Sequence, residues 1–434
     1  MRQSTRTNFG WIAASPAMRD DNQIDHASFH FHAARKMKIL PTLLSLVLLL
    51  AGANAHAAAT PAKGGAPNIY FPVPESQGGW RKLDAPQEIR TTGGMNPDKL
   101  AELRDWLLAS DQRNFAATVI RNSYIVLEVE QSNNAKTDAR RVASVSKAVC
   151  ATVVAIASEL SQQGKTPRKM LFSDPAFQFI PSAQPLSDPR KAQITVQQLF
   201  NTTSGICPES TGASNSGSWD YVLGHTDDAR LAKLAFDPGS GSGYSTHAIY
   251  HAALVCENVT GMPYDQFAIK QLFEPIGCEH WWFQYFDGEK HGHAPNHSMG
   301  MPSRDLARIA YCMLRGGDWN GRQVIPRWFV NDVAKGPTHS LRGVKELRTG
   351  RDVASYSHAW ELPTATTTTP EPWSERIPKD ARFKRGSGGQ FIAYVSSMDL
   401  VVTRQTGGSG AWEYEEYLAR ACLAVLGNGP SKTK

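Results

Sequence analysis

The feature that most constrains this chain is an apolar segment at residues 145–160 that begins directly after a serine. Its apolar and small side chains lie on every face of a helix, which predicts a helix buried on all sides. Gly164 follows at a position where helices commonly end. Such a helix needs other elements packed around it, and a chain of 434 residues, 41% of them apolar, is long enough to supply them.

Two polar side chains lie at the start of this helix. Ser144 and Lys147 are three residues apart, which places them on one face of the first turn. A serine hydroxyl becomes a good nucleophile when a base removes its proton, and a desolvated lysine amine is such a base. Burying a lysine costs free energy unless it has a partner or a use. Both residues are therefore candidate catalytic residues, although serine at a helix start is also a common capping residue.

The first 57 residues have the pattern of a targeting segment. Residues 37–57 combine a positive start, a short leucine-rich run and an A-x-A site, which predicts a secretory signal peptide. Residues 1–36 are polar and lack a fold pattern, so we interpret them as an upstream extension from a mis-assigned start. We expect an exported protein, periplasmic or secreted, with no membrane span after signal cleavage.

The charge of the chain gives no support to nucleic-acid binding. The formal charge of +6 falls to about +3 without residues 1–57, because six basic and three acidic residues leave with them. There is also no run of Lys or Arg that would track a phosphate backbone. We therefore expect no nucleic-acid partner.

The cysteine pattern is that of a core rather than of a metal or redox site. None of the six cysteines has C-x-x-C spacing, which argues against zinc and thioredoxin-type motifs. Four of them lie in apolar helical runs, where free cysteine acts as a small core residue: Cys150, Cys256, Cys312 and Cys422. We expect at most one disulfide, involving Cys207 or Cys278.

A group of histidines offers a metal site as an alternative source of chemistry. The group consists of His280, His291, His293 and His297. However, glycine and proline interrupt the segment, so no helix holds ligands four residues apart, and there is no H-E-x-x-H motif. We expect these residues to lie in an exposed loop and to bind no metal.

The order of elements predicts an α+β fold. Residues 58–95 are rich in Pro and Gly and predict an extended arm. A helix from Asn96 and a hairpin at 116–130 precede the central helix, and a hairpin at 391–403 and a helix at 411–426 end the chain. Helices are expected between them at about 194–200, 244–260, 263–274, 303–315 and 326–334. Strands at both ends predict one sheet that joins the two ends across a helical insertion.

In this order the motifs resemble those of the serine β-lactamase-related hydrolases. That family includes class C β-lactamases, D-alanyl-D-alanine peptidases, esterases and 6-aminohexanoate-oligomer hydrolases. The likeness covers about residues 70–425 and includes S-x-x-K at 144–147, a "TVxxLLxxTSG"-like stretch at 194–205 and an "LFxPLG"-like turn at 272–277. It implies an antiparallel sheet flanked by helices, in a domain at 96–430. An α/β lobe would lie at 96–145 and 375–430, and an all-helical lobe at 146–374.

The second motif of the family, Y-x-N, is similar to Tyr244-Ser245-Thr246. The resemblance implies that Tyr244 shares the proton transfer with Lys147, and we expect the nearby ammonium to favour its phenolate. Thr246 stands where the family has asparagine. A hydroxyl cannot donate and accept as an amide does, which weakens the β-lactamase interpretation.

The third motif, K-T-G, is similar to Lys384-Arg385-Gly386, and residues 388–390 resemble the "GxGGQ" signature of the esterase branch. By resemblance, the backbone N–H groups of Ser144 and Ser387 form an oxyanion hole beside Gly386. Arg385 replaces a small hydroxyl residue. It either binds a substrate carboxylate or points to solvent.

The resemblance implies a serine hydrolase that forms an acyl-enzyme at Ser144 and uses no cofactor. The Gly-Gly-Gln stretch and the absent asparagine favour a small ester or amide, or a short peptide, as substrate. A β-lactamase or D-alanyl-D-alanine carboxypeptidase is the alternative within the family. A catalytically inactive peptide-binding protein is the alternative of another class.

Overall fold

An eight-stranded sheet organises the fold, with strands in the order β1-β3-β2-β12-β11-β10-β9-β8. The computed structural model describes residues 69–215, 217–286, 298–336, 356–363 and 375–427, all within one compact unit, Ala66–Lys434. The strands of the sheet are β1 (Arg81–Lys82), β2 (Phe115–Arg121), β3 (Tyr124–Gln131), β8 (Tyr356–Ser357), β9 (Trp360–Glu361), β10 (Ala381–Gly386), β11 (Gln390–Val395) and β12 (Leu400–Gln405).

The sheet joins the two ends of the described chain. β2 pairs antiparallel with β12, with Thr118 opposite Thr403. β1 and β3 pair in parallel, and the other neighbouring strands pair antiparallel. This arrangement confirms the predicted α+β fold, in which strands from both ends of the chain meet in one sheet. The segment at 146–374 is not all-helical as expected, because β8 and β9 lie in it and extend the sheet.

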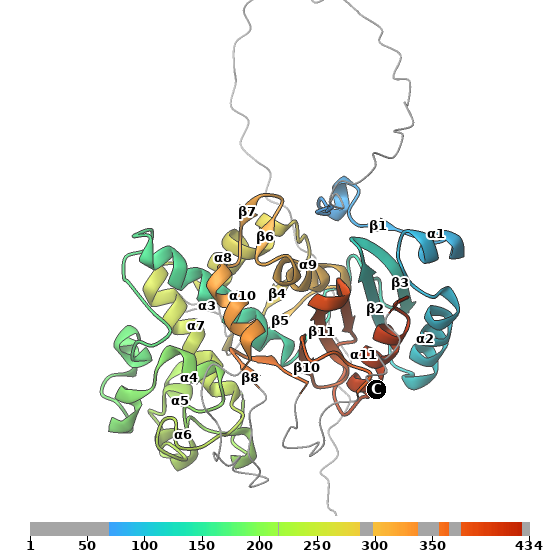
Figure 1. Cartoon of the computed structure of the whole chain (residues 1–434). Helices are drawn as coiled ribbons and strands as arrows, with labels where there is room; N and C mark the ends of the chain where they lie inside the picture. Colours follow the sequence, from blue (N-terminus) through green and yellow to red (C-terminus); the bar gives the residue numbers. More distant parts are fainter. Residues whose placement is uncertain (1–68, 216, 287–297, 337–355, 364–374, 428–434) are drawn as a thin grey trace, which may run out of the picture. The chain divides into compact units, whose positions relative to one another are not determined.

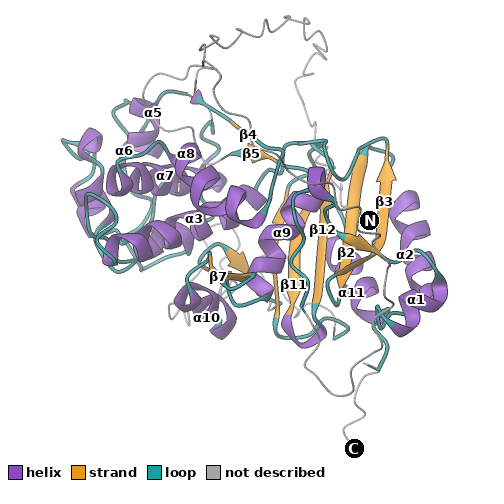
Figure 2. Ribbon diagram, turned by 90° about the horizontal axis from the view of Figure 1, so that it is seen from above, coloured by secondary structure: helices purple, strands orange, loops and turns teal. Residues whose placement is uncertain are grey.

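Alternation along the strands separates two apolar cores. On β12, Val401 packs into the core around the central helix, whereas Leu400 and Val402 pack into the core under the terminal helices. Both faces are therefore buried, and the first half of β12, residues 400–402, is apolar on both sides. Figure 2 shows helices on both sides of the strands.

Most helices occupy the positions expected from the sequence, whereas α1, α5 and α6 were not predicted. They are α1 (Pro86–Thr91), α2 (Pro97–Ser110), α3 (Val145–Gln162), α4 (Val196–Phe200), α5 (Trp219–Leu223), α6 (Ala229–Ala232), α7 (Thr246–Thr260), α8 (Tyr264–Ala268), α9 (Ser303–Leu314), α10 (Arg327–Lys335) and α11 (Tyr414–Leu423). α3 contacts α7 as well as β10 and β11 (Figure 1). Every α3 side chain from Val145 to Ser158 is buried, as the apolar pattern predicted.

Several expectations are corrected. Residues 81–91 do not form an extended arm, because they add β1 to the sheet and form α1. The segment expected as one helix at 263–274 changes after α8 into a π-helical turn, Ile269–Phe273. All six cysteines are buried free thiols, so neither Cys207 nor Cys278 forms the one disulfide that the sequence allowed.

Some predictions fall outside the described residues: the upstream extension, the signal peptide and the group His291, His293 and His297. Within the described part of the chain, no helix is long and apolar enough to cross a bilayer. That part also holds no group of three or more His, Cys, Asp or Glu side chains arranged to hold a metal ion.

Candidate active site

Ser144 lies at the start of α3, after a strained residue. Ala143 has a φ of 47°, a left-handed conformation that is rare for a residue with a Cβ. The preceding N–H, of Val142, donates to the carbonyl of Met299 (3.1 Å), which ties the turn to β5 (Met299–Gly300). The Ser144 side chain makes no capping hydrogen bond, so the capping role is wrong and its hydroxyl is free of the helix end.

Lys147 contacts this hydroxyl from the next turn. Its Nζ lies 3.2 Å from Ser144 Oγ, and the residue is 5% exposed. Burial lowers the pKa of Lys147 to about 8; Glu209 opposes that shift, and Lys384 adds to it. Much of the amine is therefore neutral in mildly alkaline solution, where it can accept the serine proton.

Tyr244 completes the cluster from the loop before α7. The Lys147 Nζ lies 4.8 Å from the centre of its ring, and Ser144 is among the neighbours that lower the pKa of its hydroxyl. Burial raises the pKa of Tyr244 well above its ordinary value, and the neighbouring Tyr356 and Glu209 raise it further. The expected phenolate is therefore wrong: the raised pKa keeps the proton on the Tyr244 hydroxyl in the neutral range.

Lys384 also lies close to the ring of Tyr244. Its Nζ lies 4.9 Å from the ring centre of Tyr244 and donates to Glu361 Oε1 (2.7 Å). Arg385 Nε donates to Glu361 Oε2 (2.7 Å), so the expectation that Arg385 points only to solvent is wrong. Burial alone would raise the pKa of Glu361, but Arg385 and Lys384 hold it below its ordinary value. One buried carboxylate thus binds both cations of the K-R-G motif.

Gly386 brings the end of β10 against the serine. A Cβ at this position would lie 2.6 Å from the carbonyl oxygen of Val142 and 3.2 Å from the Ser144 nitrogen. Tyr414 fixes the following turn, since its hydroxyl donates to the Gly386 carbonyl (2.6 Å). Within the described residues, neither the Ser144 N–H nor the Ser387 N–H donates to a protein group, so both can donate to a bound oxyanion.

Gly386→Ala should therefore reduce kcat/KM by about 100-fold or more, the usual effect of losing an oxyanion donor. The added methyl group cannot fit against a backbone carbonyl, so β10 must shift away from Ser144. Ser387→Ala is the matched control, because it keeps the Ser387 N–H and removes an exposed hydroxyl that accepts a hydrogen bond from the Gly410 N–H (3.1 Å). Steady-state kinetics on both variants test this, and equal losses in the two would contradict it.

Thr246 does not point freely into the site. Its hydroxyl donates to Glu209 Oε1. The Glu209 N–H donates to the Tyr244 carbonyl (2.7 Å), and the same carboxylate oxygen lies 3.8 Å from Lys147 Nζ. The stretch that resembles the family ends at Gly205, so the sequence did not predict a role for Glu209, which follows four residues later. It also missed Glu361, whose only signal is a carboxylate between the apolar residues Trp360 and Leu362.

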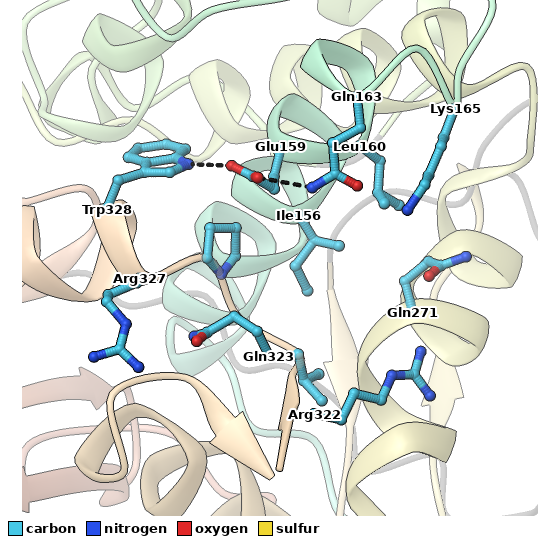
Figure 3. A pocket seen from close by; sticks show the side chains of 12 residues that line it. Ile156, Glu159, Leu160, Gln163, Lys165, Gln271, Arg322, Gln323, Arg327 and Trp328 are labelled. Carbon is cyan, nitrogen blue, oxygen red and sulfur yellow. Dashed lines mark hydrogen bonds between the residues drawn. The ribbon is translucent and has the colours of Figure 1, made fainter.

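A small pocket lies beside Lys147, Tyr244 and Lys384. It is lined by Lys147, Leu199, Phe200, Thr202, Tyr244, Ser245, Ile249, Tyr356, Ala359 and Lys384. A larger pocket of about 630 Å³ lies toward the other end of α3 (Figure 3). There Glu159 accepts hydrogen bonds from Trp328 (3.1 Å) and Gln163 (2.8 Å), and none of the candidate catalytic residues lines it. Of the candidate site residues, Lys147, Tyr244 and Lys384 line the small pocket.

Comparisons with known proteins agree with this fold. A family model described as Beta-lactamase matches residues 116–421. No curated protein sequence matches the chain.

Three solved structures illustrate the likeness. A penicillin-binding protein homolog from Caulobacter crescentus is 14% identical, with a TM-score of 0.56 over 75% of this chain and 95% of that one. A family VIII carboxylesterase is 17% identical, with a TM-score of 0.53 over 80% and 99%. A D-stereospecific amidohydrolase from Streptomyces sp. is 16% identical, with a TM-score of 0.51 over 74% and 97%. At these identities the likeness concerns the fold.

Proposed function

Because this chain belongs to the beta-lactamase family of serine hydrolases, we propose that it cleaves a small ester or amide through an acyl-enzyme at Ser144. The observation that carries the proposal is the meeting of three groups. Ser144 Oγ lies 3.2 Å from Lys147 Nζ, and the same amine lies 4.8 Å from the ring centre of Tyr244. These are a nucleophile, a base and a proton donor in one cluster.

The proposed reaction begins at the neutral amine of Lys147. The amine takes the Ser144 proton while Oγ attacks the substrate carbonyl, and the N–H groups of Ser144 and Ser387 receive the oxyanion. The phenol of Tyr244 gives its proton to the leaving alcohol or amine and regains one from the Lys147 ammonium. A water then attacks the acyl-enzyme by the reverse sequence of proton transfers and releases the acid.

The substrate proposal rests on the polar contacts of Lys384, Arg385 and Thr246. Lys384 and Arg385 are both bound to Glu361, which lowers the net positive charge available to a substrate carboxylate. Thr246 is engaged by Glu209 rather than presented to a substrate amide. Both features favour a small ester or linear amide over a β-lactam. A carboxylesterase and an amidohydrolase among the structural neighbours support the same class.

A fluorophosphonate probe and a substrate panel test the proposal. The probe should label Ser144, and nitrophenyl esters or aminohexanoate dimer should be cleaved faster than a chromogenic cephalosporin. A faster cephalosporin reaction would favour a β-lactamase, and release of D-alanine from a D-Ala-D-Ala peptide would favour a carboxypeptidase. Absence of labelling would favour a peptide-binding protein without catalysis.

We expect kcat/KM to rise with pH through about 8 and then to level. Below its pKa of about 8, Lys147 is an ammonium and cannot accept the serine proton. The phenol of Tyr244 adds no loss of activity in the neutral range, since its pKa lies well above its ordinary value. A pH profile with a nitrophenyl ester measures this, and a midpoint near 6 would indicate another base.

We also propose that the protein is exported. The support is the signal-peptide pattern at residues 37–57. N-terminal sequencing of the protein from the periplasm or medium should give a start near residue 56 or 58. A cell-associated protein that retains residues 37–57 would contradict the proposal.

A further inference from the structure

Glu209 contacts the cluster from a segment outside the three motifs. It begins the 3₁₀ turn Glu209–Thr211, and its Oε1 lies 3.8 Å from Lys147 Nζ. The same oxygen accepts a hydrogen bond from Thr246, and the Glu209 N–H donates to the Tyr244 carbonyl (2.7 Å). Both the backbone and the side chain of Glu209 are thus bound to the tyrosine motif, and the carboxylate faces the amine.

Packing alone does not account for this orientation. The Glu209 side chain is 39% exposed, so water could solvate its carboxylate fully. Instead, one carboxylate oxygen faces a lysine side chain that is only 6% exposed. Ser144 Oγ (3.2 Å) and Glu209 Oε1 (3.8 Å) therefore both lie near the same Nζ.

We propose that Glu209 is a positioning residue that keeps the Lys147 amine beside Ser144 and sets the pH range in which this amine can act as a base. The inference rests on the proposed function. It adds to that function a carboxylate which the three sequence motifs do not contain.

The charges around the amine fix the direction of the effect. The groups that face it come from five places: Arg141, Glu209, Tyr244, His247 and Lys384. Burial lowers the pKa of Lys147; Glu209 opposes that shift, while Lys384 and Arg141 add to it. Removing the Glu209 charge must therefore lower the pKa of Lys147 further.

Glu209→Gln tests the proposal, because it removes the charge and keeps the size and an acceptor for Thr246. We expect the acidic limb of the kcat/KM profile to move to lower pH by about 1–3 units, the range that one charge near 4 Å spans between a fully solvated and a partly buried setting. Glu279→Gln is the matched control. The Glu279 carboxylate also accepts hydrogen bonds from a serine, Ser76, and contacts none of the candidate residues. The acidic limb of the Glu279→Gln profile should therefore stay where it is in the wild type.

A readout without turnover separates this inference from the proposed function. In protein carrying ¹³C-labelled lysine, the Lys147 resonance is assigned with Lys147→Arg and titrated by NMR. A lower midpoint in Glu209→Gln supports the inference even if the wild type cleaves no ester or amide, in which case the proposed function alone fails.

An unchanged or raised midpoint would overturn the inference, as would an equal loss of kcat/KM at every pH. If Glu209→Gln does not fold, Thr246→Val serves instead. It releases the carboxylate from its hydroxyl donor and should move the midpoint in the same direction by a smaller amount.

Discussion

Ser144→Ala is expected to reduce ester and amide hydrolysis by about 10⁴-fold or more while the fold stays intact. The Ser144 hydroxyl forms the bond to the acyl group, and among the described residues no other hydroxyl is hydrogen-bonded to the Lys147 Nζ. The stability cost should be about 1 kcal/mol or less, because the Ser144 side chain makes no capping bond to α3. Kinetics with a nitrophenyl ester and thermal unfolding measure the two quantities.

Ser146→Ala is the matched control for this variant. Ser146 lies in the same turn, but its hydroxyl accepts a hydrogen bond from the Met299 N–H (3.2 Å) and is fully buried. Its loss should lower stability by about 1–3 kcal/mol, since it leaves a buried donor unpaired, and should keep turnover. Substantial hydrolysis by Ser144→Ala together with a loss in Ser146→Ala would contradict the assignment of the nucleophile.

The parts of the site that could be predicted are those encoded locally. The apolar run after Ser144 predicted a helix buried on all sides, and the three-residue spacing placed Lys147 on the same face as the serine. Gly386 was placed at the serine by its motif, and its lack of room for a Cβ gives the physical reason for glycine there.

The parts that could not be predicted depend on long-range neighbours. Glu361 faces Lys384 because the two-residue strand β9 pairs with β10, and two residues carry no detectable alternation. The protonation of Tyr244 shows the same limit. The nearby lysine favours the phenolate, but burial and the charge of Glu209 outweigh it, and neither can be inferred from the sequence around the tyrosine.

The second large effect concerns stability: Glu361→Leu should lower the free energy of unfolding by about 3–5 kcal/mol. Glu361 and Lys384 side chains are 3% and 1% exposed, and their contact is 2.7 Å. Removing the carboxylate leaves the Lys384 ammonium buried without its partner, whereas Arg385, 25% exposed, can turn toward water. Urea denaturation at pH 7 measures the change.

A double variant distinguishes the lost ion pair from a simple packing defect. Glu361→Leu combined with Lys384→Met removes both charges, and apolar groups of similar size often replace a buried pair without loss, so stability should return to within about 1 kcal/mol of the wild type.

The deficit of the single variant should also shrink as the pH is raised. Burial lowers the pKa of Lys384, and once Glu361 no longer opposes this, the amine becomes neutral at still lower pH and costs less to bury. The double variant should be less active than the wild type even when its stability returns, because Lys384 lines the pocket beside Tyr244. A single variant as stable as the wild type at pH 7 would contradict the role of Glu361 as the partner of both cations.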